Sequence, residues 1–319
     1  MISRPVWRRE AGADTMELQA RILVVDDESD ATRLFFEVFK RKGYEVIEAA
    51  DGTTGVRLAH ESKPDVILLD IDLPDIDGFE VCRLLKTDAA TSAIPIIFVS
   101  AHFMDEVSKV TALSIGGNDF ITKPYSIPEL AARVAVMVRI KKAEDALRYQ
   151  SVTDGLTGLY NRRFTFARLD EELSRAKRHN LSIACVVIDL DHFKKVNDEY
   201  GHLAGDTALR KVSEMLLRHA RKEDLPCRYG GEEFLLVLPQ THTAGAVTLT
   251  ERIRESLEKE AIRTDEGLVH ITLSAGIAAF PENGAATPDD LLRLADAALY
   301  EAKEKGRNRV VTYSAEKSN

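Results

Sequence analysis

Short apolar runs alternate with amphipathic stretches along the first 140 residues. The runs are rich in β-branched and aromatic residues and are bounded by turn residues, which is typical of strands. Five strands are expected, at 21–26, 44–49, 64–70, 94–100 and 118–123. The stretches beside them have helical spacing, as in 31–43, which Gly43 closes, and in 52–62. This alternation predicts an α/β, doubly wound domain over residues 20–140, with a five-stranded parallel sheet covered by helices on both faces.

The second half has a different pattern, in which helices alternate with mostly antiparallel strands. A long amphipathic helix is expected within 154–180, and the apolar strand after it ends at Asp189. Residues 226–239 indicate a hairpin whose tip is the pair Gly230–Gly231. The other expected elements are helices at 208–220, 246–258 and 288–306 and strands at 270–280 and 309–314. The pattern favours an α+β sandwich of the ferredoxin-like kind over residues 154–315.

A helix without internal glycine is expected to join the two halves. This connecting helix covers residues 128–153 and overlaps the last helix of the first domain. Val136, Ile140, Ala143 and Leu147 follow a 4-3-4 spacing, which gives the helix a narrow apolar seam. The seam either pairs with its twin in a dimer or packs only on its own domain, and the sequence leaves both readings open.

Composition narrows the class of protein. A chain of 319 residues fits two domains with a core each, and its net charge of −9 argues against nucleic acid or an anionic membrane as the main partner. Cys82, Cys185 and Cys227 lack metal-ligand spacing, which is typical of reduced thiols. No apolar run approaches the ~20 residues of a membrane span. Residues 1–19 lack the apolar block of a signal peptide, so a flexible tail, with Met16 as a second candidate start, and a cytoplasmic location are expected.

Polar residues follow four of the expected strands of the first domain. The carboxyl ends of parallel strands meet at one edge of the sheet, where ligands bind. The residues found there are Asp26, Asp27, Asp70, Ser100 and Lys123. Three carboxylates in one pocket repel one another unless a cation joins them, and Mg²⁺ is the natural guest. A carboxylate beside a metal ion and a lysine can attack a phosphoryl donor and hold an acyl phosphate. A lone Asp at a strand end is more often a helix cap, but five residues at matching strand ends favour the site.

The motifs "VVDDE", "LLDIDLPDIDG", "FVSA" and "ITKPY" resemble, in order and spacing, the receiver domain of two-component response regulators, which has a flavodoxin-like fold. The resemblance implies that Asp70 is phosphorylated by a sensor histidine kinase or a phosphotransfer protein. The implied Mg²⁺ ligands are Asp26, Asp27, Asp70 and the main-chain carbonyl of Asp72. The implied switch residues are Ser100, Phe120 and Lys123, with a cis peptide bond at Lys123–Pro124.

The stretch "RYGGEEFLLVLP", residues 228–239, raises a separate question, because two glycines and two like charges stand directly before an apolar strand. Glycine lets a hairpin tip twist and leaves room for a phosphate beside the backbone. Glu232 and Glu233 are expected to point to opposite faces of the strand, so one of them faces the neighbouring strand end at Asp189. Carboxylates from two adjacent strand ends can hold Mg²⁺ against a nucleoside triphosphate.

From "DGLTGLYNRR" to "GRNRV", the second half resembles the GGDEF family of diguanylate cyclases, with the signature in the form "GGEEF". The resemblance implies a homodimer that joins two GTP molecules into cyclic di-GMP and releases two pyrophosphates. Implied ligands of Mg²⁺ or Mn²⁺ are Asp189, the carbonyl of Leu190 and Glu232; whether Glu232 or Glu233 accepts the proton of the 3′-hydroxyl stays open. The substrate contacts that it implies are Phe193, Lys194, Asn197, His202, Asp206, Gly230, Gly231, Lys303 and Arg307.

The chemistry of these residues suits GTP. A carboxylate such as that of Asp206, with Asn197 nearby, accepts from the N1–H and N2–H of guanine and repels the bare N1 of adenine. Lys194, Lys303 and Arg307 can stabilise charge on the α-phosphate and the pyrophosphate. Some of these residues have a structural alternative: Asn197 and its neighbour Asp198 can cap a helix, and Lys303 and Arg307 can be solvated charges at a helix C-terminus.

The stretch "RKED", Arg221 to Asp224, resembles the inhibitory RxxD site of the same family, where an arginine and an aspartate grip the product. Arg252 matches an accessory arginine of that site, and Arg175 is a weaker candidate. The alternative is a solvated charged loop.

Three other functions remain alternatives: a catalytically weak cyclic di-GMP receptor, a cyclase that uses ATP, and a phosphorelay scaffold. The retained acidic signature argues against the receptor, and the guanine-reading residues argue against a cyclase that uses ATP. The scaffold reading leaves the whole second half unexplained.

Overall fold

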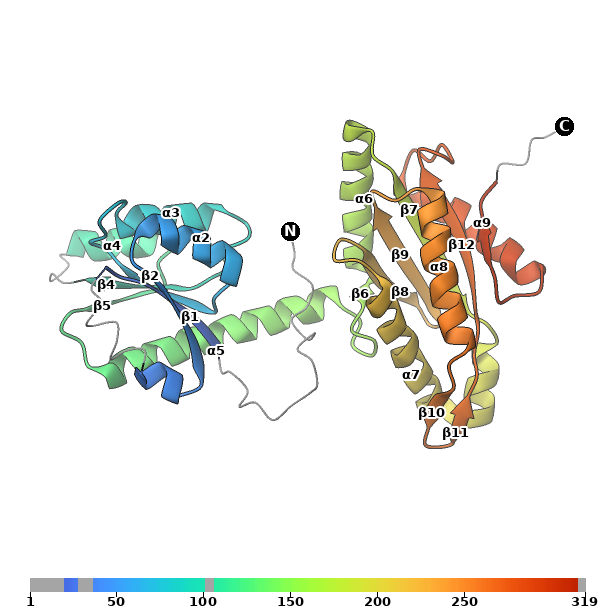
Figure 1. Ribbon diagram of the computed structural model, residues 1–319, viewed down its shortest axis with the longest axis horizontal. Coiled ribbons are helices and arrows are strands. Elements are labelled where there is room, and N and C mark those ends of the chain that lie inside the picture. Colours follow the sequence, from blue (N-terminus) through green and yellow to red (C-terminus); the bar gives the residue numbers. More distant parts are fainter. Residues whose placement is uncertain (1–19, 28–36, 101–105, 315–319) are drawn as a thin grey trace. The chain divides into compact units, whose positions relative to one another are not determined.

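The computed structural model describes residues 20–27, 37–100 and 106–314, and the chain divides into two compact units, 1–148 and 149–319 (Figure 1). The expected tail, 1–19, and much of the expected helix 31–43 lie outside the described residues. The division falls within the helix that joins the two halves, and the domain limits expected from the sequence stay predictions.

A five-stranded sheet forms the centre of the first unit. All its strands are parallel, in the order β2-β1-β3-β4-β5, which confirms the predicted doubly wound α/β fold. The strands are β1 (Ala20–Val25), β2 (Tyr44–Ala49), β3 (Val66–Asp70), β4 (Ile96–Ser100) and β5 (Asp119–Thr122). The helices are α2 (Gly52–Ser62), α3 (Gly78–Thr87), α4 (Glu106–Ser114) and α5 (Ile127–Val152).

Burial on both faces explains why these strands are almost continuously apolar. Ile22 and Val24 belong to a core shared with α5, whereas Leu23 and Val25 belong to a core shared with α2 and α3. The alternation follows from the two-residue period of a strand, which sends neighbouring side chains to opposite faces. The sheet is thus fixed between its helices, and the carboxyl ends of its strands are held at one edge.

Helix α5 buries one stripe and exposes another. The buried stripe packs on the first unit and consists of Leu130, Val134 and Val138. The predicted seam lies elsewhere on the helix: Val136, Ile140 and Leu147 are 39%, 44% and 67% exposed. The reading in which the seam packs only on its own domain is therefore wrong for these three side chains, and their apolar surface is left open to a partner.

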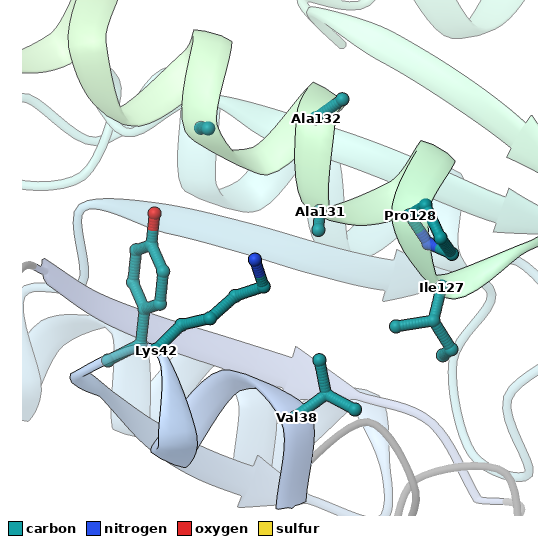
Figure 2. Close-up of a pocket in the computed structure, with 8 residues that line it drawn as sticks. Val38, Lys42, Ile127, Pro128, Ala131 and Ala132 are labelled. Atoms are coloured by element: carbon teal, nitrogen blue, oxygen red, sulfur yellow. The ribbon is translucent and has the colours of Figure 1, made fainter.

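An apolar pocket lies between the helical segment 37–41, the start of β2 and the first turns of α5 (Figure 2). It is lined by Val38, Lys42, Tyr44, Ile127, Pro128, Ala131, Ala132 and Ala135. Figure 2 shows Lys42 extending below α5. Because this lining offers one cation and no carboxylate, the pocket matches neither a divalent metal ion nor the site that the sequence predicts for GTP.

The second unit is built on a mixed six-stranded sheet in the order β13-β12-β7-β9-β8-β6. Its longer strands are β7 (Ile183–Leu190), β8 (Leu225–Gly230), β9 (Glu233–Pro239) and β12 (Leu273–Phe280), and its short edge strands are β6 (Tyr160–Asn161) and β13 (Val310–Thr312). The helices are α6 (Arg162–His179), α7 (Phe193–His219), α8 (Thr243–Glu258) and α9 (Pro288–Glu304). The central pairs are antiparallel, as predicted, while both edge strands pair in parallel.

Strand β7 lies in the middle of this sheet and has a core on each side. Ala184, Val186 and Ile188 face the core that contains α7 and α8. Cys185 and Val187 face the core that contains α6 and α9. A strand buried on both faces has little freedom to shift its register, so its carboxyl end, at Asp189, is held firmly.

Two details of the second unit differ from the sequence expectation. Helix α7 begins at Phe193, well before the helix expected at 208–220, and it has a kink at Gly201, where φ is +80°. Glycine adopts this left-handed conformation readily, which allows the helix to bend there. A small hairpin, β10 (Ile262–Thr264) and β11 (Gly267–Val269), was not expected, because three-residue strands give almost no periodic signal.

The three cysteines, Cys82, Cys185 and Cys227, are buried free thiols. Burial raises the pKa of each thiol, which keeps them protonated and unreactive. Among the described helices, none combines the length and the apolar character that crossing a bilayer demands.

Candidate functional site

Three carboxylates meet at the carboxyl edge of the first sheet. Asp26 and Asp27 follow β1, and Asp70 ends β3 beside it. One ligand oxygen from each lies within 4.8 Å of the others, and among the described residues this is the one acidic group of three that does so. Asp70 is 4% exposed, whereas Asp27 faces solvent. The convergence predicted from the strand ends is therefore found, and its all-oxygen donor set suits Mg²⁺.

Lys123 lies between two of these carboxylates. Its Nζ is 3.1 Å from Asp26 Oδ2 and 2.7 Å from Asp70 Oδ2. Burial alone would lower the pKa of Lys123, but its hydrogen bonds to Asp70 and Asp26 outweigh burial and hold the pKa above its usual value. Three negative charges and one positive charge leave two negative charges in the pocket, which a divalent cation would balance.

The other predicted residues of this site lie on β4, on β5 and in the segments that follow β3 and β5. Ser100 ends β4 and is 4% exposed, and Phe120 on β5 packs against the core next to α2 and α3. The backbone N–H of Asp72 donates to Asp70 Oδ1 at 3.1 Å. The Lys123–Pro124 peptide bond is cis, as predicted. Residue 78 must be glycine, because a Cβ there would lie 2.3 Å from the carbonyl oxygen of Asp70.

In the second unit, strands β8 and β9 form the predicted hairpin around the signature. Its tip is Gly231–Glu232, not the predicted Gly230–Gly231, because Gly230 ends β8 and pairs with Glu233. Glu232 therefore lies in the turn, and the prediction that both glutamates occupy one strand was wrong. The two-residue turn contains one glycine and one glutamate of the signature. The sequence pattern alone does not show which two of the four residues form that turn.

Asp189 and Glu233 are register partners in the antiparallel pair β7–β9. Lys303 on α9 reaches the same place, with its Nζ 2.8 Å from Asp189 Oδ2. Burial and then the charge of Asp189 raise the pKa of the Glu233 carboxyl, while Lys303 opposes the rise. Close beside them, the Leu190 N–H donates to the Glu232 carbonyl at 3.3 Å. Two carboxylates and a turn backbone thus surround one end of β7, and their repulsion is the kind that a divalent cation relieves.

The raised pKa of Glu233 leads to a stability prediction. The folded protein favours the protonated carboxyl of Glu233. The contribution of this group to the free energy of unfolding is therefore fully present at low pH and is lost as the pH rises through the raised pKa. Glu233→Gln should therefore raise the melting temperature of the metal-free protein by about 2 °C at about pH 7, and by less at about pH 4. Scanning calorimetry in the presence of a chelator measures this difference. Glu266→Gln, at an exposed glutamate between β10 and β11, should change neither value, and an equal or lower melting temperature for Glu233→Gln would contradict the prediction.

The two predicted guanine-reading residues lie near each other on α7. The side chain of Asn197 rests against Gly205, where an added Cβ would come within 2.0 Å of Asn197 Oδ1 and 3.1 Å of the Phe193 ring. Asp206 is the next residue and is half-buried. Asn197 does not cap a helix, because α7 begins four residues earlier. Lys194 and His202 are exposed on the same helix, on either side of its kink.

An arginine that the sequence analysis missed supports the hairpin tip. Arg228 on β8 donates to the Gly231 carbonyl from Nε and Nη2, at 3.1 and 2.9 Å. Its Nη1 also pairs with Asp154 Oδ1 at 3.1 Å. Asp154 opens "DGLTGL", which begins two residues after the end of α5, so Arg228 connects this segment to the signature turn. Arg228 stands directly in front of "YGGEEF", but only the register shows what it reaches.

The predicted inhibitory residues lie where α7 ends and on α8. Asp224 is 2% exposed, and its Oδ2 accepts the N–H of Arg221 at 2.5 Å, so this aspartate closes its own turn. Arg221 is exposed, and Arg252 on α8 donates to the carbonyl of His219 at 3.4 Å. Arg175 pairs with Glu172 on its own helix, α6. Arg221 therefore lies in this turn and Arg252 contacts the end of α7, while the Asp224 carboxylate closes the turn; a product-binding role for these residues stays a prediction.

Comparison with known families agrees with both resemblances. The response regulator receiver domain matches residues 22–135, and the diguanylate cyclase GGDEF domain matches residues 151–309. "Response regulator PleD" of Caulobacter vibrioides is 35% identical over 311 residues, which cover 93% of this chain and 67% of that protein. "Diguanylate cyclase DosC" of Escherichia coli K12 is 39% identical over 173 residues, which cover 54% of this chain and 37% of that protein.

Solved structures resemble the second half. The coiled coil and GGDEF domain of DgcB from Caulobacter crescentus, solved in complex with c-di-GMP, has 33% identity and a TM-score of 0.53, and the match covers 58% of this chain and 97% of that one. Diguanylate cyclase SiaD from Pseudomonas aeruginosa, solved with its activator SiaC, has 38% identity and a TM-score of 0.50, and the match covers 58% of this chain and 70% of that one. Because a receiver domain precedes a GGDEF domain, and a response regulator that is 35% identical matches 93% of the chain, the chain belongs to the receiver-linked diguanylate cyclases of the GGDEF family.

Proposed function

We propose that the protein condenses two GTP molecules into cyclic di-GMP and two pyrophosphates, and that phosphorylation of Asp70 regulates this reaction. The observation that carries the proposal is the pairing of Asp189 with Glu233 beside Lys303 at one end of the second sheet. Two carboxylates and a lysine in one place can hold a metal-bound triphosphate and stabilise the charge that moves onto the leaving pyrophosphate.

The ligands proposed for Mg²⁺ or Mn²⁺ in the second unit are Asp189, the Leu190 carbonyl and a glutamate of the signature. Glu233 is favoured as the partner of Asp189, because the two residues are in register, whereas Glu232 lies in the turn. When bound, the ion would act as a Lewis acid toward the phosphates and the 3′-hydroxyl. Glu233 is also proposed to accept the hydroxyl proton, because its position beside Asp189 is where the metal-bound nucleotide would lie.

We assign guanine recognition to Asn197 and Asp206. The carboxylate of Asp206 accepts from N1–H and N2–H, and Asn197 is held beside it by close packing on Gly205. Phe193 lies next to this pair and offers an apolar ring edge to the base. Lys194, His202, Gly230, Gly231 and Arg307 remain proposed contacts to the substrate on the strength of the family resemblance.

Each second unit binds one GTP, so the reaction requires two units that face each other. The exposed seam of α5 supports a homodimer, because apolar side chains on one stripe of a helix are stabilised by a twin. Phosphorylation of Asp70 adds negative charge where Lys123 now bridges Asp26 and Asp70. We propose that the resulting change in the receiver surface alters the receiver pairing and so brings the two catalytic units together.

We propose product inhibition through Arg221 and Arg252. Guanidinium groups bind phosphate through two parallel hydrogen bonds, which alanine cannot replace. Arg221→Ala should raise the cyclic di-GMP concentration that halves the initial rate by about 10-fold. Asp224 is a poor choice for this test, because it also closes the turn. Arg57→Ala, at an exposed arginine of α2 that pairs with Glu61, is the matched control and should leave the inhibitory concentration unchanged. Equal inhibition of wild type and Arg221→Ala would contradict a product site at this turn.

Incubation of the purified full chain with GTP and Mg²⁺, followed by chromatography of the products, tests the proposed function. Cyclic di-GMP and pyrophosphate are expected from GTP and no cyclic product from ATP. A protein that binds cyclic di-GMP but forms none from GTP would instead be a receptor. Repeating the assay with a small phosphodonor separates an enzyme controlled by its receiver from one that is not.

A further inference from the structure

The loop after α9 carries Arg307, the proposed phosphate ligand, in an unusual backbone conformation. Arg307 and Asn308 are consecutive and have φ angles of +62° and +47°. Residues other than glycine rarely adopt this left-handed region, and an arginine side chain, unlike that of asparagine, does not favour it by a hydrogen bond to the adjacent backbone. Such a conformation persists where the surroundings hold it firmly.

Two sets of hydrogen bonds to Asn308, one to its backbone and one to its side chain, act as grips that hold this loop. Its backbone N–H donates to Asp191 Oδ2 at 3.0 Å. Asp191 is 4% exposed, and the hydroxyls of Thr272 and Ser274 each donate to its carboxylate at 2.7 Å. Because Asp191 follows Asp189 by two residues, the proposed metal-binding strand end also anchors the loop of Arg307.

The second grip comes from α8. Asn308 Nδ2 donates to Glu258 Oε1 at 2.7 Å, and Asn308 Oδ1 accepts from Arg254 Nη1 at 3.0 Å. Arg254 also pairs with Glu258 at 2.9 Å, so the three side chains form a closed triangle. Both polar atoms of the Asn308 amide are used, and α8 is the helix that carries Arg252.

We propose that Asn308 is a positioning residue for the triphosphate: Asp191 fixes its backbone and α8 its side chain, and together they keep Arg307 turned toward the phosphates. This inference rests on the proposed role of Arg307 in GTP binding. Loosening the α8 grip lets the strained loop relax, so that Arg307 is presented less often to the phosphates. The α8 grip also gives that helix a physical connection to the substrate site.

The test measures nucleotide affinity by calorimetry on the full chain with Mg²⁺, using a non-reactive GTP analogue and GMP. Glu258→Ala should weaken binding of the analogue by about 3- to 10-fold, the effect of one or two hydrogen bonds, and leave GMP binding unchanged. Glu258→Gln, whose amide oxygen still accepts from Asn308 but whose amide nitrogen cannot accept from Arg254, should restore part of the affinity. Glu255→Ala is the matched control, because that glutamate contacts Lys259 on its own helix.

A double-mutant cycle then separates positioning from general destabilisation. In an Arg307→Ala background, Glu258→Ala should have no further effect on the analogue, because its action passes through Arg307. Asn308→Gly, which keeps the left-handed backbone but loses the side-chain grip, should match Glu258→Ala. Equal analogue affinity in wild type and both variants, or an equal loss for GMP, would overturn the inference. Such a result would leave the proposed function intact if the wild type still forms cyclic di-GMP from GTP.

Discussion

Replacement of Asp189 by Asn is expected to lower the rate of cyclic di-GMP formation by about 1,000-fold. The substitution keeps the shape of the side chain and removes the charge that lies beside Glu233 and 2.8 Å from Lys303. Without that charge the proposed cation would lose an oxygen ligand, and Lys303 loses its ion-pair partner. The initial rate at saturating GTP and Mg²⁺, measured by chromatography of the product, gives the loss directly.

A second measurement shows that the loss comes from the metal site. Calorimetric titration with Mn²⁺ should reveal one binding event less in Asp189→Asn than in wild type, since the receiver site is unchanged. The matched control is Asp198→Asn, at an exposed aspartate of α7, which should retain both the rate and the metal binding. Should Asp189→Asn keep a rate within about ten-fold of wild type, the site would have to be sought elsewhere.

The sequence predicts the receiver site well because its chemistry depends on strand ends alone. Parallel strands that alternate with helices have their carboxyl ends at one edge, whatever the details of twist and packing. Asp26, Asp70 and Lys123 each stand at the carboxyl end of a strand with a clear apolar run, so their convergence could be predicted without knowledge of contacts. The residue at position 78 shows the limit: its closeness to the Asp70 carbonyl depends on how the intervening loop folds back.

The second site was predicted less completely because it depends on register. Asp189 and the signature were recognised from their positions, but a shift of one residue in the turn decides whether Glu232 or Glu233 lies beside Asp189. The supporting residues gave even weaker signals. Arg228 and Asn308 act through contacts with Gly231 and Glu258, which no periodic pattern connects. Such contacts depend on how the helices and strands pack together, and no local stretch of sequence shows that packing.

Replacement of Asp70 by Asn is expected to abolish the response to a phosphodonor. Wild type should be stimulated about 10-fold by a small phosphodonor, a typical coupling between a regulatory and a catalytic site, and the variant should show equal rates with and without it. The reason is chemical, because an amide oxygen does not attack phosphorus as a carboxylate does. Asp70 is the buried member of the acidic trio and lies 2.7 Å from Lys123, so it is the carboxylate best placed to hold a phosphoryl group.

The control for Asp70→Asn is Asp88→Asn, at an exposed turn of the same unit. The Asp88 side chain accepts the backbone N–H of Ala90, and an asparagine can keep this hydrogen bond. This variant should respond as wild type does. Mass spectrometry of the phosphodonor-treated proteins adds an independent readout: wild type and Asp88→Asn should gain one phosphoryl group, and Asp70→Asn none. A full rate response in Asp70→Asn would show that the catalytic units come together without the receiver's carboxylate. An unstimulated wild type that is nevertheless phosphorylated would break the proposed link between the receiver and the pairing of the α5 seams.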